Sequence, residues 1–273
     1  MTSPAELRNE IDQAIADMQV GRALSLLKEL WRAEPSLAMA PFVIDRFGKL
    51  EGAPPSVACN LLVLRSFTVE PVVPLARAAA LCYGMDLSVR VGQFNSYVQE
   101  ILDPSSTLYQ DTTDVVLLAI QTRDLAPELW SRWTDLGAEQ AGEIVARIIA
   151  DFRTWISTIR SQSTAHILIH NLEKPALPTA GIHDAQCTKG KLAATDYVNA
   201  GLVELCGEFT GVHVIDYEQL VARHGREHWH DEHKWLTARL PIAADALVHL
   251  SNEWLRYLLP LRGRQAKCLG HDL

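Results

Sequence analysis

Short apolar segments alternate with longer amphipathic segments along most of the chain. The short segments are rich in Leu, Ile and Val, and they fall at residues 61–64, 87–91, 115–120, 166–170 and 212–215. Such runs are typical of strands that are buried on both faces of a parallel sheet. Apolar residues at helical spacing predict helices over residues 72–83, 95–102, 138–161, 192–210 and 243–259. This alternation predicts an α/β fold of three layers, with a five-stranded parallel sheet covered by helices on both faces.

The first part of the chain has helical spacing only. Apolar residues recur through residues 5–31, with a break near the middle, and again through residues 37–50. The segment 51–55 is rich in Gly and Pro, as linkers are. We therefore expect a helical hairpin and linker over residues 1–55, followed by the α/β domain over residues 56–262.

Composition and charge exclude several classes of protein. The net charge of −8 argues against a nucleic-acid partner, because no basic stripe is present to pair with a phosphate backbone. No apolar run approaches the roughly 20 residues that a membrane-spanning helix needs, so we expect no membrane association. The five cysteines form no C-x-x-C pair and are odd in number, which favours a reduced, cytoplasmic protein. The first residues include no apolar segment typical of a signal peptide.

Ser66 stands at the carboxyl end of the first predicted strand, and Pro71 marks the start of the helix that follows. Ligands bind at this edge in open α/β sheets. A serine in this place can act as a nucleophile, with nearby backbone N–H groups stabilising an oxyanion. Serine is also common in the turns where strands end, so a purely structural role is the alternative.

Three further polar stretches follow predicted strands, and they should converge with Ser66 on one cleft at the sheet edge. After the second, third and fifth strands come Gly92-Gln93-Phe94-Asn95, Gln121-Thr122-Arg123-Asp124 and Asp231-Glu232-His233. In a catalytic interpretation, His233 takes the proton of Ser66 and Asp231 orients His233. In a structural interpretation, residues 231–233 belong to a solvated polar loop.

The remaining candidates would bind the negative charge of a substrate. They are Gly92, Gln93, Asn95 and Arg123. In the catalytic interpretation, Gln93 and Arg123 bind the oxyanion or an anionic group of the substrate. An arginine holds a carboxylate or a phosphate more readily than it imitates a neutral amide donor.

Two other clusters have a functional and a structural interpretation. His224, His228, His230 and His233 lie within ten residues and, with Asp231, could bind zinc. No cysteine is near and the segment lacks regular periodicity, so we expect no metal and no other cofactor. The tryptophans either line a cleft or, as we expect, pack in or beside the core; they are Trp130, Trp133, Trp229 and Trp235.

The arrangement of these blocks resembles the SGNH (GDSL-type) hydrolases, whose fold is flavodoxin-like. Ser66-Phe67-Thr68 resembles the serine block, Gly92 the glycine block, and residues 231–233 a D-x-H variant of the last block. The resemblance implies a serine nucleophile with oxyanion donors after the next two strands. The chain departs from the pattern where Leu64-Arg65 replaces Gly-Asp, and where Arg123 stands in the place of the oxyanion asparagine.

A longer resemblance covers most of the chain. The strings SFTVEPVVPLARAAALCYGMDLSVRVGQFNSYVQEILDPSSTLY, DVVLLAIQTRDLAPELW and DEHKWLTARLP occur in order and resemble the N-terminal region of FkbH-like proteins. That resemblance implies the loading of a glyceryl unit, derived from 1,3-bisphosphoglycerate, onto an acyl carrier protein in polyketide biosynthesis. The implied partners are the carrier protein and a small acyl or phosphoglycerate-derived substrate.

FkbH-like proteins also carry a C-terminal phosphatase domain of the haloacid dehalogenase (HAD) superfamily. Residues 263–273, which include KCLGHDL, resemble the start of that domain. The resemblance implies a truncated motif without the second aspartate and the downstream Mg²⁺ ligands, and therefore no phosphatase activity in this chain.

Two functions therefore remain open at the level of sequence. One is Ser-dependent acyl transfer or ester hydrolysis, in which Ser66, Asp231 and His233 are catalytic. The other is a non-catalytic module that docks a carrier protein or positions a substrate for the phosphatase domain. The altered positions before Ser66 and at Arg123 favour the module, whereas the serine and the D-x-H block favour the enzyme.

Overall fold

A computed structural model describes residues 3–50, 57–109, 112–130, 137–177, 186–187 and 190–263. The predicted linker at residues 51–55, much of the Pro- and Gly-rich segment before residue 190, and the KCLGHDL motif lie outside the described residues. Tertiary contacts divide the chain into two compact units. One unit contains Met1–Asn60, Val69–Val89 and Ala244–Leu273, and the other contains Leu61–Thr68 and Arg90–Ala243. The domain boundaries expected from the sequence stay a prediction.

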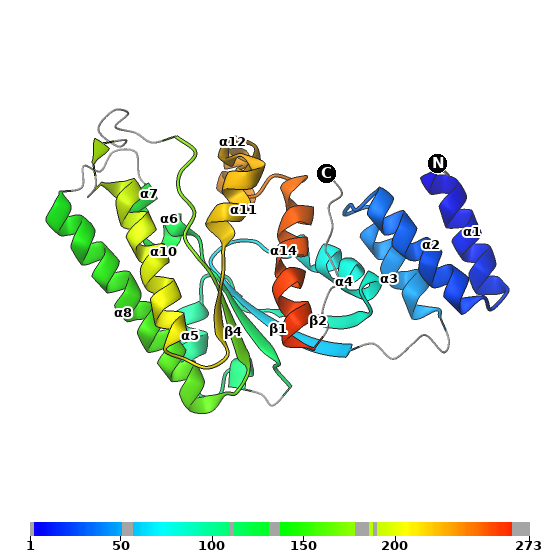
Figure 1. Ribbon diagram of the computed structural model, residues 1–273, viewed down its shortest axis with the longest axis horizontal. Coiled ribbons are helices and arrows are strands. Elements are labelled where there is room, and N and C mark those ends of the chain that lie inside the picture. Colours follow the sequence, from blue (N-terminus) through cyan, green and yellow to red (C-terminus); the bar gives the residue numbers. More distant parts are fainter. Residues whose placement is uncertain are drawn as a thin grey trace. The chain divides into compact units, whose positions relative to one another are not determined.

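The sheet has five parallel strands, as the apolar runs predict (Figure 1). The strands are β1 (Val57–Arg65), β2 (Met85–Val91), β3 (Val115–Ala119), β4 (His166–His170) and β5 (Val212–Ile215). Their order is β2-β1-β3-β4-β5, which is the flavodoxin-like order. In this order the direction of winding reverses between β1 and β3, and their carboxyl ends border the crevice where such folds bind ligands.

The centre of the sheet is apolar on both faces. Every residue of β3 is buried, and β3 pairs in register with β1 (Leu62 with Val116) and with β4 (Val116 with Ile167). Continuous burial is expected for a strand that is covered by helices on both sides. The carboxyl ends of the central strands bring polar groups together, so a site can form there without opening the core.

The larger unit packs its helices around this sheet. The helix α8 (Ala138–Gln162) lies beside α10 (Lys191–Gly207), as Figure 1 also shows, and α10 contacts β5. Shorter elements connect the strands: α5 (Tyr97–Leu102), η1 (Thr107–Tyr109), α6 (Thr122–Leu125) and α7 (Pro127–Trp130). Leu, Ile and Val side chains of the strands and of α8 and α10 form one apolar core.

The other unit is mainly helical. It contains α1 (Pro4–Ala16), α2 (Val20–Ala33), α3 (Ala40–Gly48), α4 (Val72–Cys82) and α14 (Ala246–Leu261). Ser3 caps α1 in a capping box with Glu6, and Gly84 follows α4 with φ 73°, a conformation that glycine adopts without strain. The break that the sequence predicts within residues 5–31 separates α1 from α2, and Met18 adopts φ 55° there. The N-terminal hairpin is therefore made of α1 and α2, with α3 as a third helix.

The histidine-rich segment after β5 is not the loop that the sequence predicts. It forms α11 (Tyr217–His224), α12 (Arg226–Trp229) and α13 (Glu232–Ala238). The carboxylates of Asp216 and Asp231 accept hydrogen bonds from the backbone at the starts of α11 and α13. These caps start helices that are too short to show apolar periodicity, which explains the error.

No helix in the described part of the chain is both long and apolar enough to cross a membrane.

Candidate functional site

Ser66 lies where the sequence places it, directly after β1, but its side chain is buried. Its exposed fraction is 1%. The hydroxyl accepts a hydrogen bond from the backbone N–H of Gln121 at 2.9 Å and donates one to the carboxylate of Asp124. Partial burial raises the pKa of Asp124, and the hydrogen bond from Ser66 works in the opposite direction. The hydroxyl thus ties the end of β1 to the segment that follows β3.

The loop after β2 packs against the end of β1 through its backbone. The N–H of Gly92 donates to the carbonyl of Val63 at 2.9 Å, and the N–H of Asn95 donates to the carbonyl of Arg65 at 3.1 Å. A Cβ on Gly92 would lie 2.6 Å from Oε1 of Glu100 and 3.0 Å from Cδ2 of Leu64, so a larger residue would displace these side chains. The side chains of Gln93 and Asn95 are exposed. Because the N–H of Gly92 is already bound, it is not available to an oxyanion.

The third predicted block, Asp231 and His233, lies at the start of α13. Asp231 caps this helix and pairs with Lys234, and the backbone hydrogen bond from Lys234 lowers the pKa of Asp231. The other end of α13 is tied to the serine loop, since Thr68 bonds the carbonyls of Ala238 and Arg239. A helix rises about 1.5 Å per residue. The first turn of α13, where Asp231 and His233 lie, is therefore separated from the contacts of Thr68 by the length of this helix.

His233 is exposed, and in the described structure no hydrogen bond joins it to Ser66. The catalytic assignment of Ser66, Asp231 and His233 stays a prediction.

Arg123 has the most enclosed charge among the predicted residues. Only 6% of its side chain is exposed, and its guanidinium lies over the rings of Trp130 at 4.5 Å and Trp235 at 4.4 Å. Both terminal nitrogens donate to the carboxylate of Glu232, at 3.0 and 3.3 Å. Such a pair is typical of an arginine that holds a carboxylate. The role of Arg123 in binding an oxyanion or a substrate anion stays a prediction.

A buried carboxyl group that the sequence analysis did not single out lies beside this arginine. Glu173 follows β4 and has no exposed surface. Burial raises the pKa of Glu173 to about 7, against hydrogen bonds and the nearby charge of Arg123 that lower it. The hydroxyl of Thr122 contacts the backbone carbonyl of Glu173 at 2.8 Å and its Oε2 at 2.9 Å.

The hydroxyl of Thr122 is the donor in both contacts, and the hydrogen bond that it donates to Oε2 lowers the pKa of Glu173. Burial has the larger effect, so the pKa of Glu173 still rises to about 7. The carboxyl group can therefore hold or release a proton near neutral pH.

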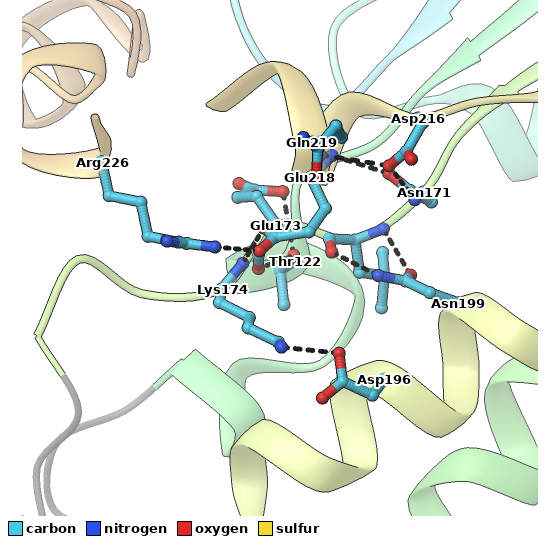
Figure 2. A network of polar contacts seen from close by, with 11 residues as sticks. Thr122, Asn171, Glu173, Lys174, Asp196, Asn199, Asp216, Glu218, Gln219 and Arg226 are labelled. Atoms are coloured by element: carbon cyan, nitrogen blue, oxygen red, sulfur yellow. Dashed lines mark hydrogen bonds and ion pairs between the residues drawn. The ribbon is translucent and has the colours of Figure 1, made fainter. Parts of the chain in front are cut away.

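A polar network holds the segment around Glu173 in place (Figure 2). Asn199 of α10 bonds both backbone groups of Leu172, at 2.8 and 2.9 Å. On the other side, the carboxylate of Glu218 accepts from the backbone N–H of Lys174 at 2.8 Å and pairs with Arg226. Figure 2 also shows Asn171 with Asp216, Asp216 with the backbone of Gln219, and Lys174 with Asp196. Glu173 therefore has a fixed position between α10 and α11.

A buried aromatic group adjoins the acid. The hydroxyl of Tyr217 accepts from Nε1 of Trp229 at 2.9 Å and from Nε2 of Gln121 at 3.4 Å. Burial raises the pKa of Tyr217, and the charge of Glu173 adds to this effect. The ring of His170 stacks on Tyr217 with centroids 4.7 Å apart, and burial lowers the pKa of His170 to about 3. Both rings are thus neutral donors or acceptors at physiological pH.

The histidines are not arranged as a metal site. In the described residues, no group of three or more His, Cys, Asp or Glu side chains could hold a metal ion. His230 is instead packed against Trp130, with centroids 5.4 Å apart, and burial lowers the pKa of His230 to about 4. Of the predicted tryptophans, Trp229 is fully buried, Trp130 and Trp235 flank Arg123, and Trp133 lies outside the described residues.

The structure thus places two groups of residues at the carboxyl edge of the sheet. In the first group, Ser66 and Gln121 form a buried hydrogen bond that links two loops. The second group is Arg123, a cation in a fixed position, and Glu173, a carboxyl group that can hold a proton near neutral pH. The second group can bind an anion and donate or accept a proton near neutral pH. The sequence contained a signal for it: Glu173 follows the fourth apolar run, just as the other candidates follow theirs.

Comparison with solved structures shows the same fold elsewhere. The chain superposes with a TM-score of 0.68 and 11% identity on a structure described as "Crystal structure of N-terminal part of the protein BF1531 from Bacteroides fragilis containing phosphatase domain complexed with Mg". The match covers 84% of this chain and 57% of the other, so this chain spans little more than half of that structure. At this identity the likeness establishes the fold alone. Comparison with curated proteins gave no match.

A family model settles the relationship that the sequence strings suggest. The model of the FkbH N-terminal domain matches residues 75–258, which is more than half of the chain. The match includes the loops after β2, β3, β4 and β5, and thus Arg123, Glu173 and α13. The chain therefore belongs to the FkbH N-terminal domain family.

Proposed function

We propose that this domain acts in the transfer of a glyceryl-type acyl unit to an acyl carrier protein in polyketide or related natural-product biosynthesis. Its role is non-catalytic: it docks the carrier protein or positions the substrate for a HAD-type phosphatase domain. Membership of the FkbH family supports the pathway. The SGNH-type relationship is part of the proposal, supported by the strand order and by the serine that follows β1.

The burial and the hydrogen bonds of Ser66 are the observations that favour a non-catalytic role. A nucleophile must reach a substrate carbon and must have a base within hydrogen-bond distance. The hydroxyl of Ser66 is buried and already bound to Gln121 and Asp124, and His233 is exposed on α13. These features suit a residue that joins two loops rather than one that attacks a thioester.

The rival proposal is Ser-dependent acyl transfer or hydrolysis. One observation favours it: the hydroxyl of Ser66 contacts a carboxylate, Asp124, whose raised pKa suits a base. In that case Asp124 would stand in the place expected for His233, and the buried hydroxyl would have to become exposed when substrate binds.

The Ser66→Ala variant tests the two proposals. We expect wild type and variant to bind an acyl-loaded carrier protein equally in calorimetry, and neither to form a covalent adduct with a short acyl thioester in a mass spectrum. Asp231→Asn and His233→Ala should also leave carrier binding intact. An acyl adduct on wild type that the Ser66→Ala variant lacks would establish the rival proposal instead.

A further inference from the structure

Arg123 is enclosed to a degree that a surface salt bridge does not require. Its guanidinium lies over two indole rings, those of Trp130 and Trp235, and 6% of the side chain is exposed. The rings restrict the directions in which its N–H groups can donate, and they stabilise the cation without satisfying those groups. A partner for Arg123 must therefore be an acceptor that fits between the two rings.

Glu232 provides that acceptor, but it comes from the surface. Its side chain is 64% exposed, and its carboxylate binds both terminal nitrogens of Arg123. A carboxylate that remains largely in water gains little from such a pair, whereas the enclosed arginine needs an anion. The ion pair therefore stabilises Arg123 more than it stabilises Glu232. Another carboxylate can replace that of Glu232 at a small cost in free energy.

Buried polar atoms without a partner surround this arginine. Among the described residues, no normal hydrogen bond is made by Nε of Arg123, Oε1 of Gln121, Oε1 of Glu173 or either ring nitrogen of His230. Glu173 is hydrogen-bonded to Thr122, the residue before Arg123, and the ring of Trp130 contacts both Arg123 and His230. Buried polar atoms without partners are rare, and their concentration at one place indicates a polar ligand.

We propose that Arg123 is the binding residue for a small hydroxycarboxylate, and that Glu232 occupies its place until that ligand arrives. The ligand's carboxylate replaces that of Glu232 on the guanidinium. Its hydroxyl groups bind the acceptors on Gln121 and Glu173 and the imidazole of His230. Glu232 then swings into solvent, since its side chain is already largely exposed.

The enclosure of Arg123 selects a small molecule rather than a macromolecule. The guanidinium is covered by two rings and by Glu232, with 6% of the side chain exposed, so the acceptor that replaces Glu232 must be small enough to enter between the rings. The site also holds a carboxylate in this structure, and a carboxylate ligand repeats that geometry.

Binding of three small probes tests the proposal: glycolate, acetate and glycerol. Glycolate carries a carboxylate and a hydroxyl group. Acetate has the carboxylate without the hydroxyl, and glycerol has hydroxyls without a carboxylate. The readout is the indole N–H signals of Trp130 and Trp235 in ¹H–¹⁵N NMR spectra, assigned with the Trp130→Phe and Trp235→Phe variants. Ionic strength is held constant, because exposed ion pairs weaken with salt.

Glycolate should shift both indole signals in wild type, and more weakly binding acetate should need a higher concentration. The Glu232→Gln variant should bind glycolate up to about fivefold more tightly, the gain expected when a weak competing ion pair is removed. Arg123→Lys should weaken binding by about tenfold or more, because lysine cannot donate two parallel hydrogen bonds from a rigid fork.

Glu208→Gln is the matched control, since Glu208 forms a similar two-bond pair with Arg153 on the surface. This variant should bind glycolate as wild type does. The proposal is overturned if Glu232→Gln does not bind glycolate more tightly than wild type, or if glycerol binds as well as glycolate. The Glu232→Gln variant tests the proposal even if the Arg123→Lys variant fails to fold. Its expected effect is tighter binding of glycolate, which a misfolded protein would not show.

Discussion

At the scale of single residues, Glu173 shows how burial sets a charge state. The group has a pKa near 4.5 when exposed and about 7 in the fold, because water is excluded from it. The unfolded chain releases this proton at lower pH than the folded protein does. Folding stability due to this group is thus highest below pH 4.5 and is lost as the pH rises to about 7.

Replacing Glu173 by Gln should remove this pH dependence. The amide keeps the size of the neutral acid and cannot ionise, so the variant should be more stable than wild type at pH 8 by up to about 3 kcal/mol. At pH 4 the two should unfold at similar urea concentrations. Glu204→Gln, at an exposed position of α10, is the control and should change little at either pH. Equal destabilisation by Glu173→Gln at both pH values would show that the carboxyl is ionised in the fold.

At the scale of elements, a glycine allows α10 to pack closely on α8. A Cβ built on Gly201 would lie 2.9 Å from Cδ1 and 3.2 Å from Cγ1 of Ile149, on α8. Gly142 is also inside a helix, in α8, but its Cβ would meet nothing within 4 Å. Glycine costs helix stability at both positions, and only at Gly201 does packing give a reason for it.

The two alanine variants should therefore differ in their effect on the free energy of unfolding. Gly142→Ala should stabilise the protein by about 0.5–1 kcal/mol through helix propensity. Gly201→Ala should be neutral or destabilising, because the methyl group forces Ile149 to move, at a cost of about 1–3 kcal/mol. Thermal or urea unfolding measures both. Stabilisation of equal size at the two positions would mean that the α8–α10 contact is loose.

At the scale of the whole molecule, the sheet has a buried centre and partly exposed edges. Every residue of β3 is buried between β1 and β4, while β5 is an edge strand in which His213 is exposed. Local opening is least favourable where burial and pairing are complete on both sides. Amide hydrogens of Val116–Leu118 should therefore exchange more slowly than those of β5. Native-state hydrogen exchange followed by NMR checks this order, and faster exchange in β3 would contradict it.

The sequence by itself determined the five strands of this fold. Apolar runs of strand length placed β4 at residues 166–170 and β5 at residues 212–215 with the observed bounds, and β1, β2 and β3 within a few residues. This succeeds because a parallel strand covered on both faces must be apolar along its length. The short helices after β5 were missed, since three helices of four to eight residues depend on caps and contacts rather than on periodicity.

The sequence also determined that polar residues meet at the carboxyl edge, because parallel strands place their ends together. Only the tertiary structure decided which of them face one another. Side-chain direction follows from packing: Ser66 turns inward to Gln121, His233 faces solvent, and Arg123 lies between two tryptophans. The proton on Glu173 is decided at the same level, since residue type fixes only the unperturbed pKa. Segments that are distant in the sequence exclude water from the carboxyl group and thereby raise its pKa.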